Sequence, residues 1–274
     1  MAAARSRRYS DMTNLSSSLA TVPPLLLAGK RVVVLGSGSG LGRAVAQHAQ
    51  AAGAEVLGVD DHKVFDGLDA LYHADLNDPA ALDAAAHALP DGIDGLALLP
   101  DPGTGGPEQT LTRALLAPRH LAQALAPKLA HGAAVLACAA PPHSTWHARL
   151  GETRAAMALR WDDLGGFVAR WGLLAEPDRT ARTAGWAMQA WVMAQHNRWA
   201  DRAIRLNALT PASPDGRLPP DLVAEGGRDA ASGTDTAARA ALFLLSDLSQ
   251  GLTGANLAAD GGLCARIMTS LDGL

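Results

Sequence analysis

The chain has 274 residues, of which 48% are hydrophobic and 18% are charged, and its formal net charge is −4. This is the composition of a globular protein with enough apolar residues for a sizeable core. The slightly acidic balance argues against nucleic acid or an anionic membrane as the main partner. The two cysteines, Cys138 and Cys264, lie far apart in apolar segments, so we expect reduced, buried thiols and no cysteine-bound metal.

The first 29 residues are rich in serine and arginine and contain one short apolar stretch after Pro23 and Pro24. That stretch is too short for a secretory signal. No apolar run in the chain approaches the ~20 residues of a membrane span. We expect residues 1–29 to be a disordered or loosely attached extension, with a transit peptide as the alternative, and we expect a cytoplasmic protein.

Apolar runs and helix-like segments alternate along the rest of the chain. The predicted strands are 31–36, 54–60, 70–76, 92–99, 132–140, 203–210 and 254–260. The predicted helices are 41–53, 78–89, 111–130 with a kink at Pro118, 185–200 and 235–247. The alternation predicts an α/β, Rossmann-type doubly wound parallel sheet of about seven strands with helices on both faces. It forms one domain over 30–262, with a helical insertion over about 141–178 and a C-terminal tail over 263–274.

The sequence GSGSGLG closes the first predicted strand and opens the first predicted helix. Gly36 would form the tight turn, Gly40 would let the backbone approach a pyrophosphate, and Gly42 would let helix and strand pack closely. A helix N-terminus offers free N–H groups and a positive dipole end to phosphates. The residues expected to bind a dinucleotide here are Gly36, Ser37, Ser39, Gly40, Leu41 and Gly42. A purely structural glycine turn is the alternative.

Residues at the ends of the second and third predicted strands extend the prediction of a dinucleotide site. Asp60 ends the second predicted strand, where a carboxylate accepts hydrogen bonds from ribose hydroxyls and repels a 2′-phosphate. This favours NAD over NADP as the cofactor. Asp75 and Leu76 end the third predicted strand and are expected to border the adenine. The alternative for Asp60 is a solvated turn residue beside Asp61.

With these motifs the chain resembles the short-chain dehydrogenase/reductase family, from about residue 30 to residue 262. The features that carry the resemblance are the glycine spacing at Gly36, Gly40 and Gly42, the aspartate at Asp75, the segment IRLNALTP at 204–211 and the C-terminal segment 243–262. The insertion makes the chain similar to the 3α-hydroxysteroid dehydrogenase/carbonyl reductase-like subgroup. The resemblance implies an NAD-dependent oxidoreductase that acts on alcohols or ketones.

The four redox residues that this family uses are missing. Carried over from IRLN without gaps, the family's tyrosine falls on Ala181, its lysine on Gly185, its serine on Ala139 and its asparagine on about Ala114. The only tyrosines are Tyr9 and Tyr72, and the only lysines are Lys30, Lys63 and Lys128. A phenol needs a nearby cation to act as a base at neutral pH. We therefore predict no catalytic residues and a degenerate member of the family, a pseudo-dehydrogenase.

Other groups could replace the missing chemistry, and each is disfavoured. The candidates are His143 and His147 with Glu152 as metal ligands, Cys138 or Ser144 as a nucleophile, and Arg182 as an anion-binding group. Apart from Glu152, no third ligand is evident beside the two histidines, so no metal site is predicted. The thiol lacks a nearby cation and the serine lacks a base.

The insertion offers a partner role instead. An apolar seam of helical period runs along it, at Met157, Trp161, Leu164, Val168 and Trp171, with a break expected at Gly165 and Gly166. Internal packing is one interpretation. The other is an interface, because tryptophan and arginine are enriched there. We predict a structural or regulatory subunit in a homo-oligomer, or in a hetero-oligomer with a catalytically complete homologue. The alternative function is an NAD(H)-dependent alcohol/ketone oxidoreductase or a repurposed non-redox enzyme with atypical catalytic groups.

Overall fold

The computed structural model describes residues 26–63, 66–141, 147–211 and 233–271. Its strands form one sheet in the order β3-β2-β1-β4-β5-β6-β7, and all neighbouring pairs are parallel. The strands are β1 (Arg31–Leu35), β2 (Glu55–Asp60), β3 (Ala70–His73), β4 (Ile93–Leu98), β5 (Leu129–Cys138), β6 (Arg205–Pro211) and β7 (Asn256–Ala259). The strand order reverses between β1 and β4, which confirms the predicted Rossmann-type doubly wound sheet.

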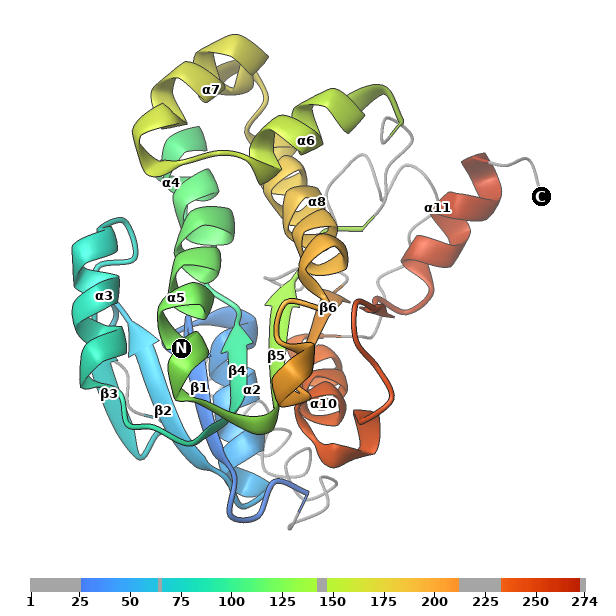
Figure 1. Ribbon diagram of the computed structural model, residues 1–274. Coiled ribbons are helices and arrows are strands. Elements are labelled where there is room, and N and C mark those ends of the chain that lie inside the picture. The colour runs from blue at the N-terminus through green and yellow to red at the C-terminus, as the bar shows by residue number, and fades with distance from the viewer. Residues whose placement is uncertain (1–25, 64–65, 142–146, 212–232, 272–274) are drawn as a thin grey trace, which may run out of the picture.

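Helices cover both faces of the sheet (Figure 1). The longer helices are α2 (Gly40–Ala51), α3 (Pro79–Ala88), α5 (Ala117–Leu125), α8 (Pro177–Gln195) and α10 (Thr234–Leu245). Val32 and Val34 of β1 pack into one core with α2 and α10. Val33 and Leu35 pack into the other core with α3, α5 and α8. Because successive side chains of a strand point to opposite faces, a strand buried on both faces is apolar throughout.

The helix that follows β4 widens just before Pro118. It runs from α4 (Pro107–Leu111) through a π-helical turn (Thr112–Leu116) into α5. Proline has no N–H, and its ring crowds the carbonyl four residues earlier. The kink predicted at Pro118 therefore takes the form of a π-helical turn, and this turn carries the buried Arg113.

The insertion consists of α6 (Leu150–Met157), α7 (Leu164–Trp171) and short 3-10 turns. It lies over the carboxyl ends of the strands, where α6 contacts α8 and α7 contacts α4 (Figure 1). The break that we predicted at Gly165 and Gly166 is wrong, because both glycines lie in the first turn of α7. Glycine costs a helix only about 1 kcal/mol relative to alanine, and the burial of Phe167 and Val168 outweighs this cost.

The apolar seam of the insertion faces the protein's own core. Val168 is buried, and the other seam residues pack against the core that holds α3, α5 and α8. Trp186, Trp191 and Trp199 are buried as well. Internal packing accounts for these tryptophans, and Trp146 lies outside the described residues. The partner role of the insertion stays a prediction.

Helix α8 begins at Pro177, well before the predicted start at residue 185. Arg179 and Thr183 gave this stretch a polar character, yet both are buried. Their partner is Glu152 of α6, which accepts hydrogen bonds from Arg179 Nη2 at 2.6 Å and from Thr183 Oγ1 at 2.6 Å. The start of α8 is thus completed by a carboxylate from another helix.

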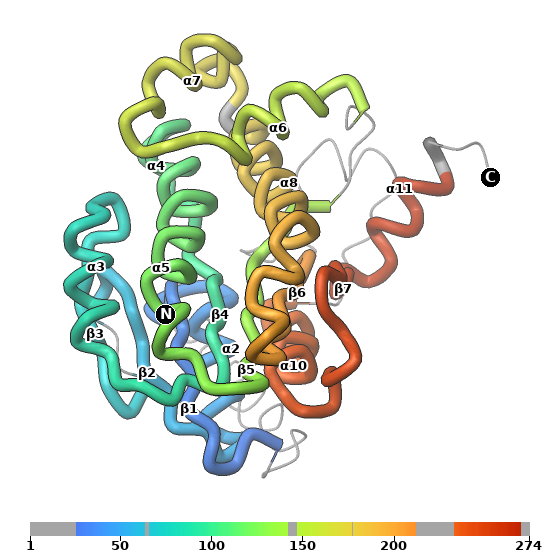
Figure 2. The backbone as a smooth tube through the Cα atoms, in the orientation of Figure 1, coloured from blue at the N-terminus to red at the C-terminus, as the bar shows by residue number. Residues whose placement is uncertain are grey.

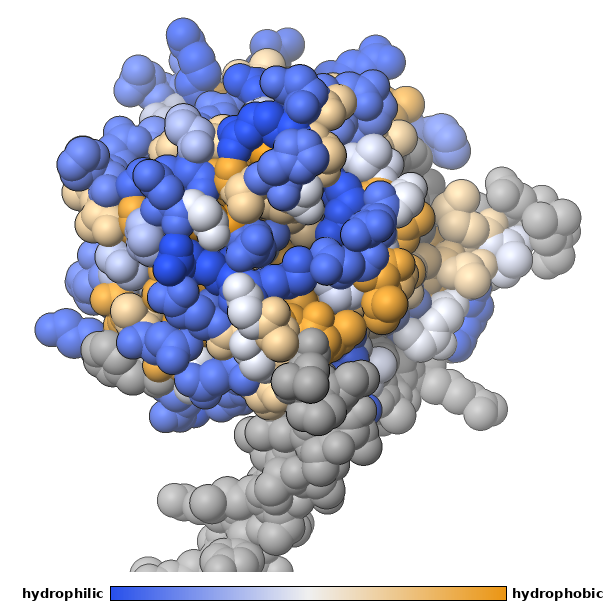
Figure 3. Space-filling view, turned by 60° about the horizontal axis from the view of Figure 1, so that its bottom comes forward, coloured by the Kyte–Doolittle hydropathy of each residue, from blue (hydrophilic) through white to orange (hydrophobic). Residues whose placement is uncertain are grey.

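Both ends of the described chain pack against the domain or extend it. Leu27 is fully buried, and its N–H donates to the carbonyl of Ala52 at 2.9 Å. At the other end, α11 (Leu263–Leu271) is helical where we predicted a tail, and it projects from the body of the molecule (Figure 2). Among the described helices, none is long and apolar enough to cross a membrane. The face seen in Figure 3 is largely hydrophilic, with smaller groups of apolar residues between the charged ones.

Candidate nucleotide site

The glycine turn between β1 and α2 has the geometry that the sequence predicted. Gly36 has a φ of +86°, and a Cβ placed on it would lie 2.3 Å from Pro100 Cα. A Cβ on Gly42 would lie 2.1 Å from the carbonyl oxygen of Gly36. Gly40 also has a positive φ, of +50°. No other residue fits at Gly36 or Gly42, so strand–helix packing alone already requires these glycines.

The N-terminus of α2 is open to an anion. Ser39 is the N-cap residue, and its side chain makes no capping hydrogen bond. No acidic residue stands in the first turn. Free N–H groups at such a helix start favour a phosphate. Of the remaining turn residues, Leu41 is buried in the core, and Ser37 is buried with no hydrogen-bond partner for its hydroxyl among the described residues.

Asp60 is directed inward, toward the turn. Its side chain is 1% exposed. One carboxylate oxygen accepts the N–H of Gly38 at 2.9 Å, and the other accepts the N–H of His62 at 2.8 Å. The imidazole of His62 lies 2.9 Å from the same second oxygen. Asp60 therefore holds the glycine turn in place, which is a different task from the predicted contact with a ribose.

Asp61 and Arg113, to which the sequence analysis gave no role, lie beside Asp60. The guanidinium of Arg113 forms a buried ion pair with Asp61, and its Nε donates to the carbonyl of Asp101 at 2.8 Å. Burial alone would raise the pKa of Asp61, but the hydrogen bond and charge of Arg113 outweigh it and lower that pKa. The hydrogen bond to Asp60 raises the pKa of His62. The sequence signal that could have revealed this pair is the arginine inside the apolar run LTRALLA. An arginine in a buried helix needs an acidic partner.

Of the two residues predicted to border the adenine, one is exposed and the other is buried. Asp75 is exposed, and one oxygen of its carboxylate accepts hydrogen bonds from the backbone and the side-chain amide of Asn77, at 2.8 and 2.9 Å. The side chain of Leu76 is fully buried in the core. Leu76 can therefore face a ligand only through its backbone.

On the other side of the sheet reversal, two of the vacated catalytic positions, Gly185 and Ala139, are closed by packing. A Cβ on Gly185 would lie 2.4 Å from Ala140 Cβ and 2.6 Å from Ala140 N. Ala139 is buried, and its N–H donates to Leu209 O at 2.8 Å. Trp186 is buried next to them, and its Nε1 donates to Pro141 O at 2.8 Å. Helix α8 thus packs directly on the end of β5, with no room for a lysine side chain at residue 185.

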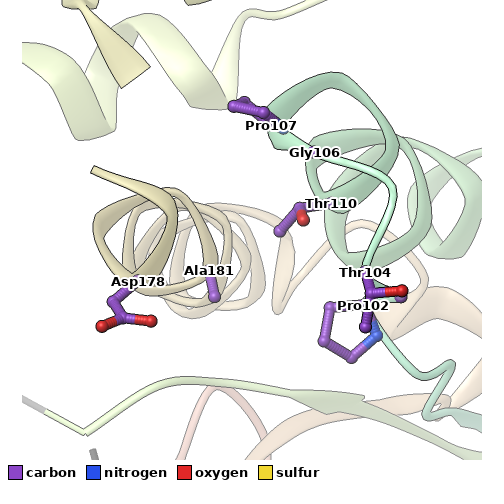
Figure 4. A pocket seen from close by; sticks show the side chains of 8 residues that line it. Pro102, Thr104, Gly106, Pro107, Thr110, Asp178 and Ala181 are labelled. Carbon is purple, nitrogen blue, oxygen red and sulfur yellow. The ribbon is translucent and has the colours of Figure 1, made fainter. Parts of the chain in front are cut away.

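Ala181, the family's tyrosine position, borders a cavity of about 270 Å³. The cavity lies between the first turns of α8 and the segment that leads into α4, and Thr110 and Ala181 face each other across it (Figure 4). The residues with polar side chains that line it are Thr104, Thr110 and Asp178. A cavity of this size holds a small molecule, although it lacks the phenol and the ammonium of the family's redox site.

The other groups considered from the sequence are not arranged for catalysis in the described part of the chain. Burial raises the pKa of the Cys138 thiol to about 12, so this thiol is protonated at neutral pH. Glu152 is engaged by Arg179 and Thr183 and is not available to a metal. His143 and Ser144 lie outside the described residues. Asp60, Asp61 and His62 cluster closely enough to hold an ion, but N–H donors already engage both carboxylates.

A nicotinamide dinucleotide, which this fold commonly binds, fits only part of this edge of the sheet. The glycine turn and the free N-terminus of α2 suit a pyrophosphate. On the β2 side, the Arg113–Asp61 ion pair stands next to Asp60, where the first nucleoside is expected. On the β5 side, the close contact of Gly185 with Ala140 leaves no room for the lysine that would hold the second ribose. The residues present therefore fit the phosphates and do not supply the family's lysine contact to the second ribose.

Sheet order, glycine turn and helix placement define a doubly wound protein of the dinucleotide-binding class. No family model matches the chain. A coniferyl-alcohol dehydrogenase from Pseudomonas sp. strain HR199 is 26% identical over 251 residues, which span 87% of this chain and 98% of that protein. The chain is therefore similar over most of its length to a curated dehydrogenase, and its doubly wound sheet agrees with this match.

Solved structures agree on the fold. A 3α-hydroxysteroid dehydrogenase from Pseudomonas sp. B-0831, solved with NADH, has a TM-score of 0.67 at 22% identity, over 88% of this chain and 99% of that one. A short-chain dehydrogenase/reductase variant from Serratia marcescens has a TM-score of 0.61 at 20% identity, over 87% and 99% of the two chains. At these identities the likeness concerns the fold alone.

Proposed function

We propose that this chain is a cytoplasmic, non-catalytic member of the short-chain dehydrogenase/reductase family that keeps a nucleotide turn of the NAD type and acts as a structural or regulatory subunit. The contact between Gly185 and Ala140 carries the proposal. A chain that had lost its lysine by a single substitution would retain room for that side chain. Here the backbone of α8 lies against the end of β5, and a Cβ alone would lie 2.4 Å from Ala140 Cβ.

The residue inventory supports the same conclusion. The chain has no tyrosine after Tyr72 and no lysine after Lys128, so neither partner of the family's acid–base pair exists near the site. Cys138 is protonated at neutral pH and gives no nucleophile. Among the residues that the structure describes, Ala139, Ala181 and Gly185 offer no side-chain proton donor to a carbonyl.

The direct test is steady-state turnover. The purified full chain is incubated with NAD or NADP and a panel of secondary and benzylic alcohols, including coniferyl alcohol, and with the reduced cofactors and the matching carbonyl compounds. We expect no change in the absorbance of the reduced nicotinamide above the protein-free control. Turnover at a rate typical of enzymes, a kcat of about 1 per second or more, would overturn the proposal.

The partner role is tested by the native mass. We expect an oligomer, formed with itself or with a homologue that carries the serine, tyrosine and lysine. Leu174, at the end of the insertion, is 75% exposed, and Met193 of α8 is 56% exposed, so both side chains are accessible to a partner. Sedimentation of the purified chain and of the complex isolated from the source cell measures this. A monomer in both preparations would contradict the partner role.

A second candidate function is an oxidoreductase with atypical catalytic groups. The observation that favours it is the cavity beside Ala181, with Asp178 and two threonines in its lining. The named function of the coniferyl-alcohol dehydrogenase, which aligns over nearly its whole length, favours it too. If turnover were found, Asp178→Asn would abolish it in this second account. Loss of activity in that variant, with an unchanged melting temperature, would identify the carboxylate as the acid–base group.

A further inference from the structure

The cavity beside Ala181 is lined by a carboxylate that has no counter-charge. Asp178 stands in the first turn of α8 and is exposed, and among the described residues none forms a hydrogen bond or an ion pair with it. The next residue, Arg179, is buried, and its guanidinium is held by Glu152 and Glu176. The cavity therefore carries one negative charge that this neighbouring arginine does not neutralise.

Both walls of the cavity are fixed by contacts of their own. On the side that leads into α4, Gln109 Oε1 accepts the N–H of Gly105 at 2.6 Å, and Arg113 Nε donates to Asp101 O at 2.8 Å. On the side of α8, the carboxylate of Glu152 anchors the first turns of the helix. A ligand that enters between two fixed walls requires little reorganisation of the protein, which favours binding.

The lining favours a small cation with an apolar body. Asp178 and Pro102 line the cavity from opposite sides, and Pro107 adds a second apolar ring (Figure 4). An ammonium group donates hydrogen bonds to carboxylate and hydroxyl oxygens, and Thr104 and Thr110 supply the hydroxyls. The volume of about 270 Å³ lies just below the roughly 300–1,000 Å³ of common ligand pockets, so the ligand is small.

We propose that this cavity binds a small primary amine, with the ammonium group on Asp178 and the apolar part against Pro102 and Pro107. This ligand differs in charge from the neutral alcohols and ketones that the family resemblance implies. One turn further along α8, Gly185 is packed against Ala140, so the position of the family's lysine stays closed beside the ligand. The inference rests on the proposed non-catalytic function in one respect: the amine is bound as a regulatory ligand and is not converted.

The test is a saturation-transfer NMR titration of the full chain with three probes that share an aromatic ring and differ in charge. The probes are 2-phenylethylamine, 2-phenylethanol and 3-phenylpropionate. We expect the amine to bind with a dissociation constant of about 1 mM, as suits so small a ligand. The alcohol should bind about fivefold more weakly, the upper value for an ion pair open to solvent, and the carboxylate should show no saturable binding.

Variants locate the site. Asp178→Asn should lower the affinity for the amine to that for the alcohol and leave the affinity for the alcohol unchanged. The matched control is Asp162→Asn, which removes an exposed carboxylate of the insertion outside the cavity lining and should not change either affinity. Ala181→Phe fills the cavity and should abolish the binding of both probes. Thermal unfolding of each variant shows that it is folded.

Three results would overturn the proposal: equal affinities for amine and alcohol in the wild type, amine binding that survives Asp178→Asn or Ala181→Phe unchanged, or no saturable amine binding at all. The proposed function fails in a different way. If the amine recovered after incubation with NAD were oxidised, as mass spectrometry would show, the chain would be catalytic and the amine site would still stand.

Discussion

Gly185 is the residue at which α8 packs closely against Ala140, at the end of β5. Because a Cβ there would lie 2.4 Å from Ala140 Cβ, we expect Gly185→Ala to lower the free energy of unfolding by about 1–3 kcal/mol, as overpacking does. Chemical denaturation measures this. Gly166→Ala is the control, since its Cβ would meet no atom within 4 Å and alanine favours a helix, so it should stabilise slightly. A neutral Gly185→Ala would contradict the close packing.

The same geometry governs an attempt to restore the acid–base pair. The double variant Ala181→Tyr with Gly185→Lys supplies both missing side chains, but the lysine must displace Ala140. The family's serine and asparagine positions still hold Ala139 and Ala114. We expect no NAD-dependent turnover from this variant and a lower melting temperature than that of the wild type. An active double variant would show that the site had kept its architecture.

His62 is the titratable residue that steadies the glycine turn. Its pKa is raised above the usual 6.5 by the hydrogen bond to Asp60. A His pKa that is higher in the folded than in the unfolded state gives stability that is fully present below pH 6.5 and is lost as the pH rises through the folded pKa. We expect an NMR titration of His62 to have its midpoint above 6.5. His62→Gln should remove this part of the pH dependence of unfolding, and a midpoint at or below 6.5 would contradict the contact with Asp60.

At the scale of elements, one carboxylate joins the insertion to the domain. Glu152 of α6 accepts hydrogen bonds from Arg179 and Thr183 of α8 and is 1% exposed. Glu152→Gln removes the buried charge that pairs with Arg179, and Glu176, at 2.9 Å from Arg179 Nη1, compensates only part of that loss, so the variant should cost about 3 kcal/mol of unfolding free energy. Glu55→Gln, in the exposed pair with Arg31, is the control and should change it by less than about 1 kcal/mol. Equal effects would show that the insertion is held by apolar contacts alone.

Glu152 also shows why the start of α8 could not be predicted from the sequence. The strands and α2 could be predicted because their apolar periods and the glycine turn are local signals. The start of α8 could not, because Arg179 and Thr183 are polar and are buried only through Glu152, which is 27 and 31 residues away in the chain. Arg113 was missed for a similar reason, since its partner Asp61 lies on a different strand end. Local patterns cannot show which distant charge a buried side chain will meet.

For the whole molecule, the doubly wound parallel sheet and its two helical layers could be predicted from the sequence, because strand-like and helix-like segments alternate along the chain. Whether the sheet edge beside the glycine turn is open or closed could not be predicted from the sequence. The sequence indicated that Ala181 and Gly185 had replaced the acid–base pair, and it left open whether a cavity remained. In the structure, α8 closes the lysine position, whereas a cavity of about 270 Å³ remains beside Ala181. The molecule thus retains the fold and the phosphate turn, and the described chain lacks the space for the family's lysine.

The central claim, that this chain does not transfer hydride, is tested most directly by isotope transfer. The purified full chain is incubated for a long period with NAD and alcohols that carry deuterium on the reacting carbon, and the cofactor is analysed by mass spectrometry. We expect no more deuterium in the cofactor than in a protein-free control. Deuterium that accumulates in proportion to protein concentration, and that is lost in Asp178→Asn, would contradict the claim and assign the chemistry to the cavity beside Ala181.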